Sequence, residues 1–225
     1  MNIEDFINDN YSVALNELDL KLKKYLSYKN GVFLEVGAND GIRQSNTYIF
    51  EKFADWTGIL IEPSSYYNQL NVNRPNSIHF NCALVSYDWN KSTIIGDFGN
   101  PNSNAKNLMS TTEQSNMFKG GKTEVLAKKI DDVISSTKFV EFDLISLDTE
   151  GSELSVLKGF NFNKHKTKYF LIEISDSPEH MKANNIKDDN NRNNIYSLLE
   201  KNGYELIEDF KSGDYLFKNK NFINE

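Results

Sequence analysis

Residues 32–41 read Val-Phe-Leu-Glu-Val-Gly-Ala-Asn-Asp-Gly, and this stretch decides the fold. Its first half, from Val32 to Val36, is an apolar run with a single acid, and the run stops at Gly37. Apolar residues at helical spacing resume from Thr47. A buried strand, a tight glycine turn and a helix together form the small-molecule crevice of an open parallel sheet. Glycine at position 37 allows both the sharp turn and the close approach of a ligand.

The residues around this turn favour a cationic ligand over a dinucleotide. The dinucleotide fingerprint needs glycine at its first, third and sixth positions, but positions 39 and 42 hold Asn and Ile. Glu35 and Asp40 flank the turn, and carboxylates favour a neighbouring cation over a pyrophosphate. S-adenosylmethionine carries a sulfonium, an amino group and a ribose, all of which suit carboxylates. An ordinary strand-end turn without a ligand explains this stretch about equally well.

Four further acids are expected at the same edge of the sheet. The run Gly58-Ile-Leu-Ile-Glu-Pro places Glu62 at the end of a second strand, where a carboxylate can take both ribose hydroxyls. The apolar runs 142–148 and 169–173 end on or near Asp148, Glu150 and Glu173. Because parallel strands place their carboxyl ends at one edge, we expect the last three acids to meet. Such a cluster can deprotonate a hydroxyl, anchor an amino group or hold a divalent metal. The metal is possible but not indicated, since no His or Asn stands at a fixed spacing.

Composition bounds the class of protein. The chain has 225 residues, of which 39% are hydrophobic and 12% aromatic, enough for a full core. Its net charge of -7 argues against a nucleic-acid partner, which would favour a basic face. One cysteine, Cys82, excludes an internal disulfide and fits a reducing compartment. No signal peptide and no run of about 18 apolar residues is seen, so we expect a cytoplasmic protein without a membrane span.

The apolar pattern also predicts the organisation of the chain. Residues 1–30 read as an N-terminal helical extension, with one amphipathic helix over 11–28, and residues 31–225 as a Rossmann-like domain. Within the domain, residues 86–122 are rich in Asn, Ser, Gly and Pro and read as an irregular insertion, with a lid as one possible role. A polar stretch over 176–194 contains His180 and follows a strand end beside the expected site. The chain closes on a predicted hairpin, 204–209 and 214–218, whose last strand is antiparallel.

The sequence contains seven short motifs in a fixed order. They are Glu-Val-Gly-Ala-Asn-Asp-Gly at 35–41, Gln-Ser-Asn-Thr at 44–47, Trp-Thr-Gly-Ile-Leu-Ile-Glu-Pro at 56–63, Arg-Pro at 74–75, Ala-Leu-Val-Ser at 83–86, Asp-Thr-Glu-Gly-Ser-Glu-Leu at 148–154 and Val-Leu-Lys-Gly at 156–159. Through these motifs the chain resembles the FkbM-type methyltransferases, which depend on S-adenosylmethionine. The resemblance covers about residues 33–173. It implies an α/β, Rossmann-like class I methyltransferase fold, with a mostly parallel sheet and helices on both faces.

The resemblance also implies roles for individual residues. The methionine part of the cofactor would be cradled by Glu35, Gly37, Asn39 and Asp40. Glu62 would bind the ribose, and Ala83 would lie near the adenine. Ser45, Asn46 and Thr47 would line the pocket from the helix start. Ala38, Pro63 and Asp148 complete the expected cofactor-binding set, and the candidate catalytic residues are Asp148, Glu150 and Glu173.

The function implied is O-methylation of a hydroxyl on a sugar, a polysaccharide or a natural product. Two alternatives from other classes stay open at this point. One is a scaffold or partner protein that binds the cofactor without catalysing transfer. The other is a nicotinamide-dependent oxidoreductase, which the missing glycine at position 39 disfavours.

Overall fold

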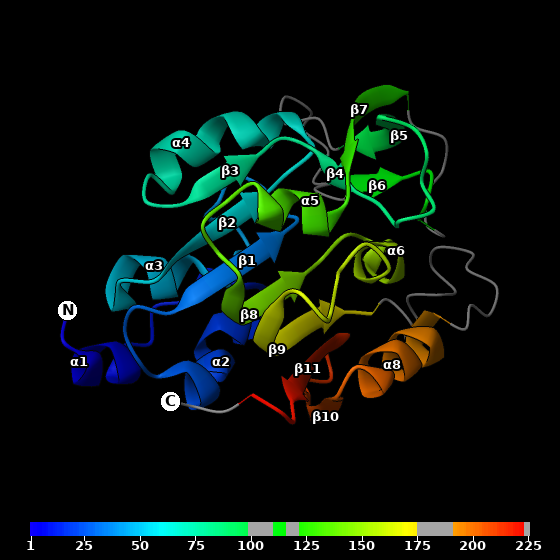
Figure 1. Ribbon diagram of the computed structural model, residues 1–225. Helices are drawn as coiled ribbons and strands as arrows, with labels where there is room; N and C mark the ends of the chain where they lie inside the picture. Colours follow the sequence, from blue (N-terminus) through cyan, green and yellow to red (C-terminus); the bar gives the residue numbers. More distant parts are fainter. Residues whose placement is uncertain (99–109, 116–121, 175–190, 223–225) are drawn as a thin grey trace.

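The structure, a computed structural model, describes residues 1–98, 110–115, 122–174 and 191–222 (Figure 1). Its centre is a seven-stranded sheet with the order β10-β11-β9-β8-β1-β2-β3. These strands are β1 (Val32–Val36), β2 (Thr57–Ile61), β3 (Ile78–Phe80), β8 (Glu141–Leu147), β9 (Lys166–Glu173), β10 (Tyr204–Asp209) and β11 (Asp214–Asn219).

The direction of the strands matches the fold class expected from the sequence. Strands β3, β2, β1, β8 and β9 pair in parallel, and β11 pairs antiparallel with both β9 and β10. The five parallel strands follow the doubly wound order, which reverses direction at β1. The Rossmann-like class I methyltransferase fold and its antiparallel C-terminal hairpin are therefore confirmed.

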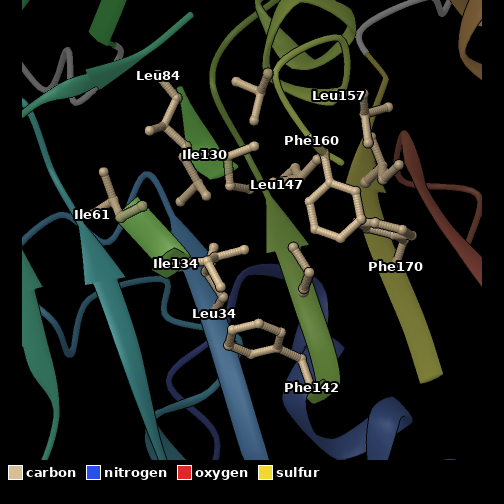
Figure 2. Packing of buried hydrophobic residues seen from close by; sticks show 14 of the residues in the cluster. Leu34, Ile61, Leu84, Ile130, Ile134, Phe142, Leu147, Leu157, Phe160 and Phe170 are labelled. Atoms are coloured by element: carbon tan, nitrogen blue, oxygen red, sulfur yellow. The ribbon is translucent and has the colours of Figure 1, made fainter. Parts of the chain in front are cut away.

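Alternating residues of each central strand face opposite layers of helices. Leu34 of β1 and Ile145 of β8 belong to a buried cluster shared with three helices on one face (Figure 2). These helices are α5 (Ile130–Ser135), α6 (Glu153–Leu157) and α8 (Asn191–Lys201). Phe33 and Leu144, one residue away in each strand, belong to a second cluster on the opposite face. The sheet is thus buried on both sides, as parallel sheets require.

The N-terminal extension packs on that second face. The helices there are α1 (Ile3–Asn8), α2 (Leu18–Leu26), α3 (Tyr48–Ala54) and α4 (Leu70–Asn73). Phe6 of α1 and Leu22 and Leu26 of α2 are fully buried in the same cluster as Phe33. Residues 1–30 therefore contribute to the core of the sheet domain.

The helix predicted over 11–28 is shorter in the structure, where α2 begins at Leu18 after a 3-10 turn (Leu15–Glu17). The reason is the buried carboxylate of Asp19, which accepts hydrogen bonds from the amides of Val13 at 2.9 Å and Ala14 at 3.3 Å. These bonds hold the preceding residues in a turn rather than in a helix. The backbone of Asn16 and Glu17 has positive φ, which breaks the helical path.

The segment predicted to be irregular, 86–122, contributes two strands to a second, four-stranded sheet of order β4-β7-β5-β6. The strands are β4 (Ala83–Leu84), β5 (Thr93–Phe98), β6 (Ser110–Thr112) and β7 (Thr123–Lys128). Ile94 of β5 packs with Ala83 and Val85 in a small buried cluster, which explains why β5 is ordered despite its polar neighbours. In Figure 1 this sheet lies beyond the carboxyl ends of β1 and β2. The prediction of irregular structure is therefore wrong for residues 93–98 and 110–112, and the role as a lid stays a prediction.

Several sequence predictions fall outside the described ranges. They include the Asn-rich run within 99–104, the glycine pair at 120–121, and His180 with most of the polar stretch 176–194. Within the described ranges, every helix is too short or too polar to cross a bilayer.

Candidate active site

A cavity of about 270 Å³ opens at the carboxyl ends of β1, β2 and β8, where the strand order reverses. This is the position at which open α/β sheets bind their ligands. Its walls come from strand ends, from the turns that follow them and from β6 of the small sheet. The lining residues are Val36, Gly37, Asn39, Arg43, Gln44, Glu62, Pro63, Tyr66, Cys82, Ala83, Leu84, Thr112, Asp148, Thr149, Glu150 and Ser152.

Glu62 is buried at the end of β2 and joins two of these walls. One carboxylate oxygen accepts the amide of Asn39, and the other accepts the amide of Ser64, both at 2.8 Å. Burial raises the pKa of Glu62, while these hydrogen bonds act in the opposite direction. Each carboxylate oxygen has a further lone pair, so the group can still accept hydroxyl donors from the cavity.

Gly37 allows the end of β1 to lie in close contact with the residue that follows β8. Its φ is +84°, and a Cβ atom placed on it would lie 2.0 Å from the carbonyl oxygen of Asp148. A side chain is therefore excluded by the protein's own backbone, independently of any ligand. The sequence alone attributes this glycine to the turn and to ligand approach; the contact with Asp148 adds a third reason.

The predicted acids Asp148, Glu150 and Glu173 do meet. Their side chains each offer an oxygen, and these oxygens lie within 4.8 Å of one another. Asp148 and Glu150 line the cavity, whereas Glu173 is outside its lining and has one buried oxygen without a partner among the described residues. Carboxylates this close share protons or a divalent cation, because they cannot all be ionised at low cost.

The proton is best placed on Glu173. The charge of Asp148, together with burial, raises the pKa of Glu173 to about 12. Burial and the charge of Glu35 also raise the pKa of Asp148, but the hydrogen bond with Glu173 lowers it. The hydrogen bond between the two carboxyl groups raises the pKa of Glu173 and lowers that of Asp148, so a proton that they share lies on the Glu173 side. This arrangement leaves Asp148 as the carboxylate that can accept a proton from the cavity.

From the third acid of this cluster, Glu150, we predict that the stability of the protein depends on pH. Burial, followed by the charges of Asp148 and Glu153, raises the pKa of Glu150 from 4.5 to about 8. Between these two pH values the folded chain binds more protons than the unfolded chain, so stability falls as pH rises. We expect the melting temperature to drop across this range and the drop to be smaller in Glu150→Gln. Thermal unfolding without ligand measures it; Glu141→Gln, at an exposed position of β8, is the control. An equal drop in both variants would contradict the shift.

The turn carrying these acids is fixed from two sides. One carboxylate oxygen of Glu153 accepts the amides of Thr149 at 2.9 Å and Gly151 at 3.1 Å. From the small sheet, the Ser115 hydroxyl donates to the carbonyl of Glu150 at 2.5 Å, and the Thr112 hydroxyl lies 3.3 Å from that of Ser152. The segment 110–115 is therefore in direct contact with the candidate site.

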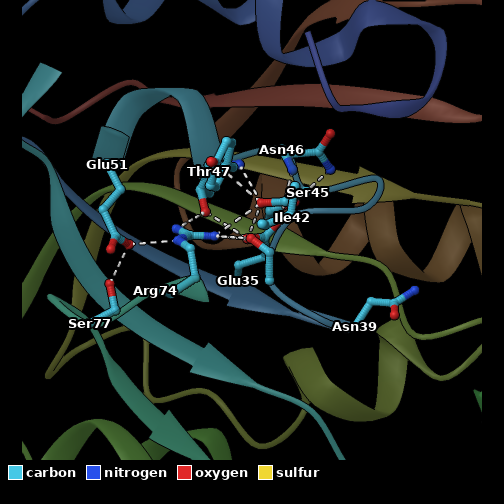
Figure 3. A network of polar contacts seen from close by, with 12 residues as sticks. Glu35, Asn39, Ile42, Ser45, Asn46, Thr47, Glu51, Arg74 and Ser77 are labelled. Atoms are coloured by element: carbon cyan, nitrogen blue, oxygen red, sulfur yellow. Dashed lines mark hydrogen bonds and ion pairs between the residues drawn. The ribbon is translucent and has the colours of Figure 1, made fainter. Parts of the chain in front are cut away.

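Glu35 lies beneath the cavity in a buried polar network (Figure 3). Its carboxylate accepts the Ser45 and Thr47 hydroxyls at 2.8 Å and 2.6 Å and the Asn46 amide at 2.7 Å. Figure 3 shows the Arg74 guanidinium between Glu35 and Glu51. It lies 3.5 Å from the Glu35 carboxylate and donates to Glu51 at 2.7 Å.

The predicted cofactor-binding residues therefore divide into two groups. Those lining the cavity are Gly37, Asn39, Glu62, Pro63, Ala83 and Asp148. Those outside the lining are Glu35, Ala38, Asp40, Ser45, Asn46 and Thr47. Asp40, for example, accepts the amides of Ile42 at 2.9 Å and Arg43 at 2.7 Å and so fixes the turn. A direct contact of this second group with a ligand stays a prediction.

Arg43, Gln44, Tyr66 and Thr112 line the cavity but were not predicted to do so. Arg43 and Gln44 follow the first glycine turn, and Tyr66 lies in the 3-10 turn (Ser65–Gln69) after Glu62. Both positions follow strand ends at the crevice, which is the signal that could have identified them. Thr112 comes from β6, a strand the sequence did not reveal.

The residues present fit a cationic nucleoside ligand. Glu62, Asp148 and Glu150 supply carboxylates, and one end of the cavity is formed by the small or apolar residues Cys82, Ala83 and Leu84. A sulfonium and an ammonium suit the acids, a ribose suits Glu62, and a planar base suits the apolar end. A pyrophosphate would meet three carboxylates and is disfavoured.

The strand order and this acidic cavity at its switch point define a protein of the class I methyltransferase type. Residues 35–206, more than half of the chain, match the family model described as the methyltransferase FkbM domain. The chain therefore belongs to the FkbM family of S-adenosylmethionine-dependent methyltransferases, as its motifs indicated. Membership of this family rules out the nicotinamide-dependent oxidoreductase considered from the sequence.

Among solved structures, the chain is similar to the fibrillarin pre-rRNA processing protein of Methanococcus jannaschii, with 11% identity and a TM-score of 0.48 over 95% of this chain and 84% of that one. It is also similar to a SAM-dependent methyltransferase from Geobacter sulfurreducens in complex with S-adenosyl-L-homocysteine, with 7% identity and a TM-score of 0.42 over 92% and 72%. Since both TM-scores are below 0.5, the fold class rests on the strand order instead. No curated protein matches the chain in sequence.

Proposed function

We propose that this methyltransferase acts on a hydroxyl group of a sugar, a polysaccharide or a natural product. The observation that carries the proposal is the proton-sharing pair of Asp148 and Glu173 at the cavity wall. A hydroxyl must lose its proton as it is methylated, and an ionised carboxylate held at that point is a suitable general base. The hydrogen bond with Glu173 lowers the pKa of Asp148 and so favours its ionised form.

The other residues of the cavity suit the task of holding the cofactor. Glu62 binds the ribose hydroxyls, and the wall formed by Cys82, Ala83 and Leu84 accommodates the adenine. The turn at Gly37 and Asn39 receives the methionine part. Glu35 acts indirectly in this scheme, since its hydrogen bonds fix residues 45–47 under the turn.

When bound, the cofactor supplies a methyl group that a nucleophile can take directly from a sulfonium. The chain's own contribution is to orient the acceptor hydroxyl and to accept its proton at a carboxylate oxygen of Asp148. Holding two reactants in place contributes up to about 7–11 kcal/mol in favourable cases, and a positioned base adds about 10²–10⁴-fold. Before the transfer, the hydrogen bond from Glu173 stabilises the charge on Asp148; after Asp148 has accepted the hydroxyl proton, both carboxyl groups are neutral.

Methyl transfer to defined acceptors tests this proposal. The purified chain would be incubated with methyl-labelled S-adenosylmethionine and panels of sugars, oligosaccharides, hydroxylated natural products, amines and thiols. We expect label only in hydroxyl compounds, with a methoxy signal in the NMR spectrum of the product. Label on nitrogen, sulfur or carbon would contradict hydroxyl specificity. Cofactor binding without transfer to any acceptor would instead favour the non-catalytic partner considered from the sequence.

The role of Glu62 predicts a loss of cofactor affinity in Glu62→Gln. The amide keeps the size of the side chain, but its NH₂ group faces a backbone N–H and it no longer offers an anionic acceptor to the ribose. Charged hydrogen bonds are worth about 1.5–3 kcal/mol, so we expect affinity to fall by about 10- to 100-fold. Calorimetric titration with S-adenosylmethionine and S-adenosylhomocysteine measures this. The control is Glu205→Gln on the exposed side of β10. Unchanged affinity would restrict Glu62 to a structural role.

A further inference from the structure

Arg43 is the only cationic side chain among the described residues that line the cavity. Its backbone is fixed, because the Asp40 carboxylate accepts its amide at 2.7 Å and the Val13 carbonyl accepts the next amide, that of Gln44, at 3.1 Å. Its side chain is exposed. In the part of the chain that the structure describes, no acid or carbonyl group pairs with its guanidinium. Arg43 thus combines a fixed backbone with unused guanidinium donors in the lining of the cavity.

The proposed cofactor would require a cationic side chain in this cavity. S-adenosylmethionine carries a carboxylate at the end of its amino-acid part, besides the ammonium and the sulfonium. The acids Glu62, Asp148 and Glu150 offer no cationic partner to that carboxylate, and any of them that is ionised repels it. With the adenosine at Cys82–Leu84 and Glu62, the amino-acid part lies on the side of Gly37 and Asn39. Arg43 follows Asn39 by four positions in the same turn.

We propose that Arg43 binds the carboxylate of the cofactor's amino-acid part. A guanidinium presents paired N–H donors in the geometry of a carboxylate, so the contact can be bidentate. The inference rests on the proposed orientation of the cofactor in this cavity. In this arrangement the acids of the cavity contact the positively charged groups of the ligand, and Arg43 contacts its one negatively charged group.

A pair of ligands isolates this contact. Decarboxylated S-adenosylmethionine keeps the sulfonium, the amine and the adenosine but lacks the carboxylate. We expect the wild-type chain to bind S-adenosylmethionine about 10- to 100-fold more tightly than the decarboxylated compound. In Arg43→Gln this preference should disappear, because only S-adenosylmethionine loses affinity. Arg43→Lys should restore part of it, since a lysine keeps the charge but not the fork. Lys201→Gln, which removes the same charge from α8 outside the cavity, should behave as the wild type.

The other outcomes overturn the inference in distinguishable ways. If Arg43→Gln weakens both ligands equally, or neither, Arg43 does not bind the carboxylate. If it leaves both affinities unchanged but lowers turnover with a methyl acceptor, Arg43 belongs to the acceptor site. If the wild-type chain binds neither ligand, the proposed cofactor site itself is wrong, and this inference fails with it.

Discussion

Replacing Asp148 with asparagine is expected to lower kcat by about 10²–10⁴-fold, because the amide cannot accept the proton that a methylated hydroxyl releases. Affinity for the cofactor should stay within about an order of magnitude, since Glu62 and the apolar wall are untouched. Initial rates with a responsive acceptor, paired with calorimetric titration of S-adenosylhomocysteine, measure both quantities. Asp132→Asn makes the same change at an exposed position of α5 and should leave both unchanged. A variant with undiminished turnover would remove Asp148 from the reaction.

The pH dependence of the wild-type enzyme belongs to the same prediction. Asp148 acts only when ionised, so turnover should be lost as pH falls through the range where it gains a proton. Burial and the charge of Glu35 raise its pKa, so this loss should occur at a higher pH than for an ordinary aspartate. In Asp148→Asn the remaining activity should lack this acidic limb. A limb that persists in the variant would assign the titration to another group.

Removing the Arg74 side chain is expected to destabilise the protein by about 3–5 kcal/mol, because Arg74→Ala leaves the buried carboxylates of Glu35 and Glu51 without their cation. Only 1% of this side chain is exposed, so water cannot replace it. The guanidinium also donates to the Gly41 carbonyl at 3.0 Å and the Thr47 hydroxyl at 2.9 Å, so the turn under the cavity loses support as well. Urea unfolding measures the stability, and cofactor titration should show a weakened site.

Two further variants distinguish the loss of this buried network from the loss of any cationic side chain. Lys24→Ala removes an exposed cation that pairs with Glu208 at 3.1 Å, and such surface pairs are worth about 0–1 kcal/mol. Arg74→Lys keeps the charge but cannot donate to all the same partners, so it should lie between the wild type and Arg74→Ala. A loss in Arg74→Ala no larger than that in Lys24→Ala would contradict the importance of the network.

The sequence predicts the large sheet well because its strands are apolar runs that end in recognisable turns. Leu34 and Ile145 face one helical layer, while Phe33 and Leu144 face the other, so continuous apolar runs indicate strands buried on both sides. The small sheet escaped prediction because β5 and β6 lie in a segment rich in Asn, Gly and Pro residues, and β6 has only three residues. The alternation of β5 around Ile94 becomes evident only once its partner β7 is known.

The candidate site is predictable where it depends on strand ends. Asp148 and Glu173 could be brought together from sequence because parallel strands share one edge. The role of Glu35 could not be predicted, because its partner Arg74 lies 39 positions away in the sequence, at the end of α4. Thr112 was missed for the same reason, since its place at the cavity depends on pairing between distant segments.

The pairing of β4 with β7 bears on how the acceptor range of such an enzyme can diversify. Ala83 lies opposite Ala127, so the chain leaves the neighbourhood of the cavity and returns to it at hydrogen-bonded neighbours. Changes in length between two such points cost little closure entropy and need not disturb the seven-stranded sheet. Thr112 and Ser115 lie between these points and contact Ser152 and Glu150. Additions or deletions here would therefore alter the surroundings of these residues while Glu62 stays in place. We therefore expect changes in the length of this segment to alter the lining of the cavity more readily than substitutions in the seven-stranded sheet.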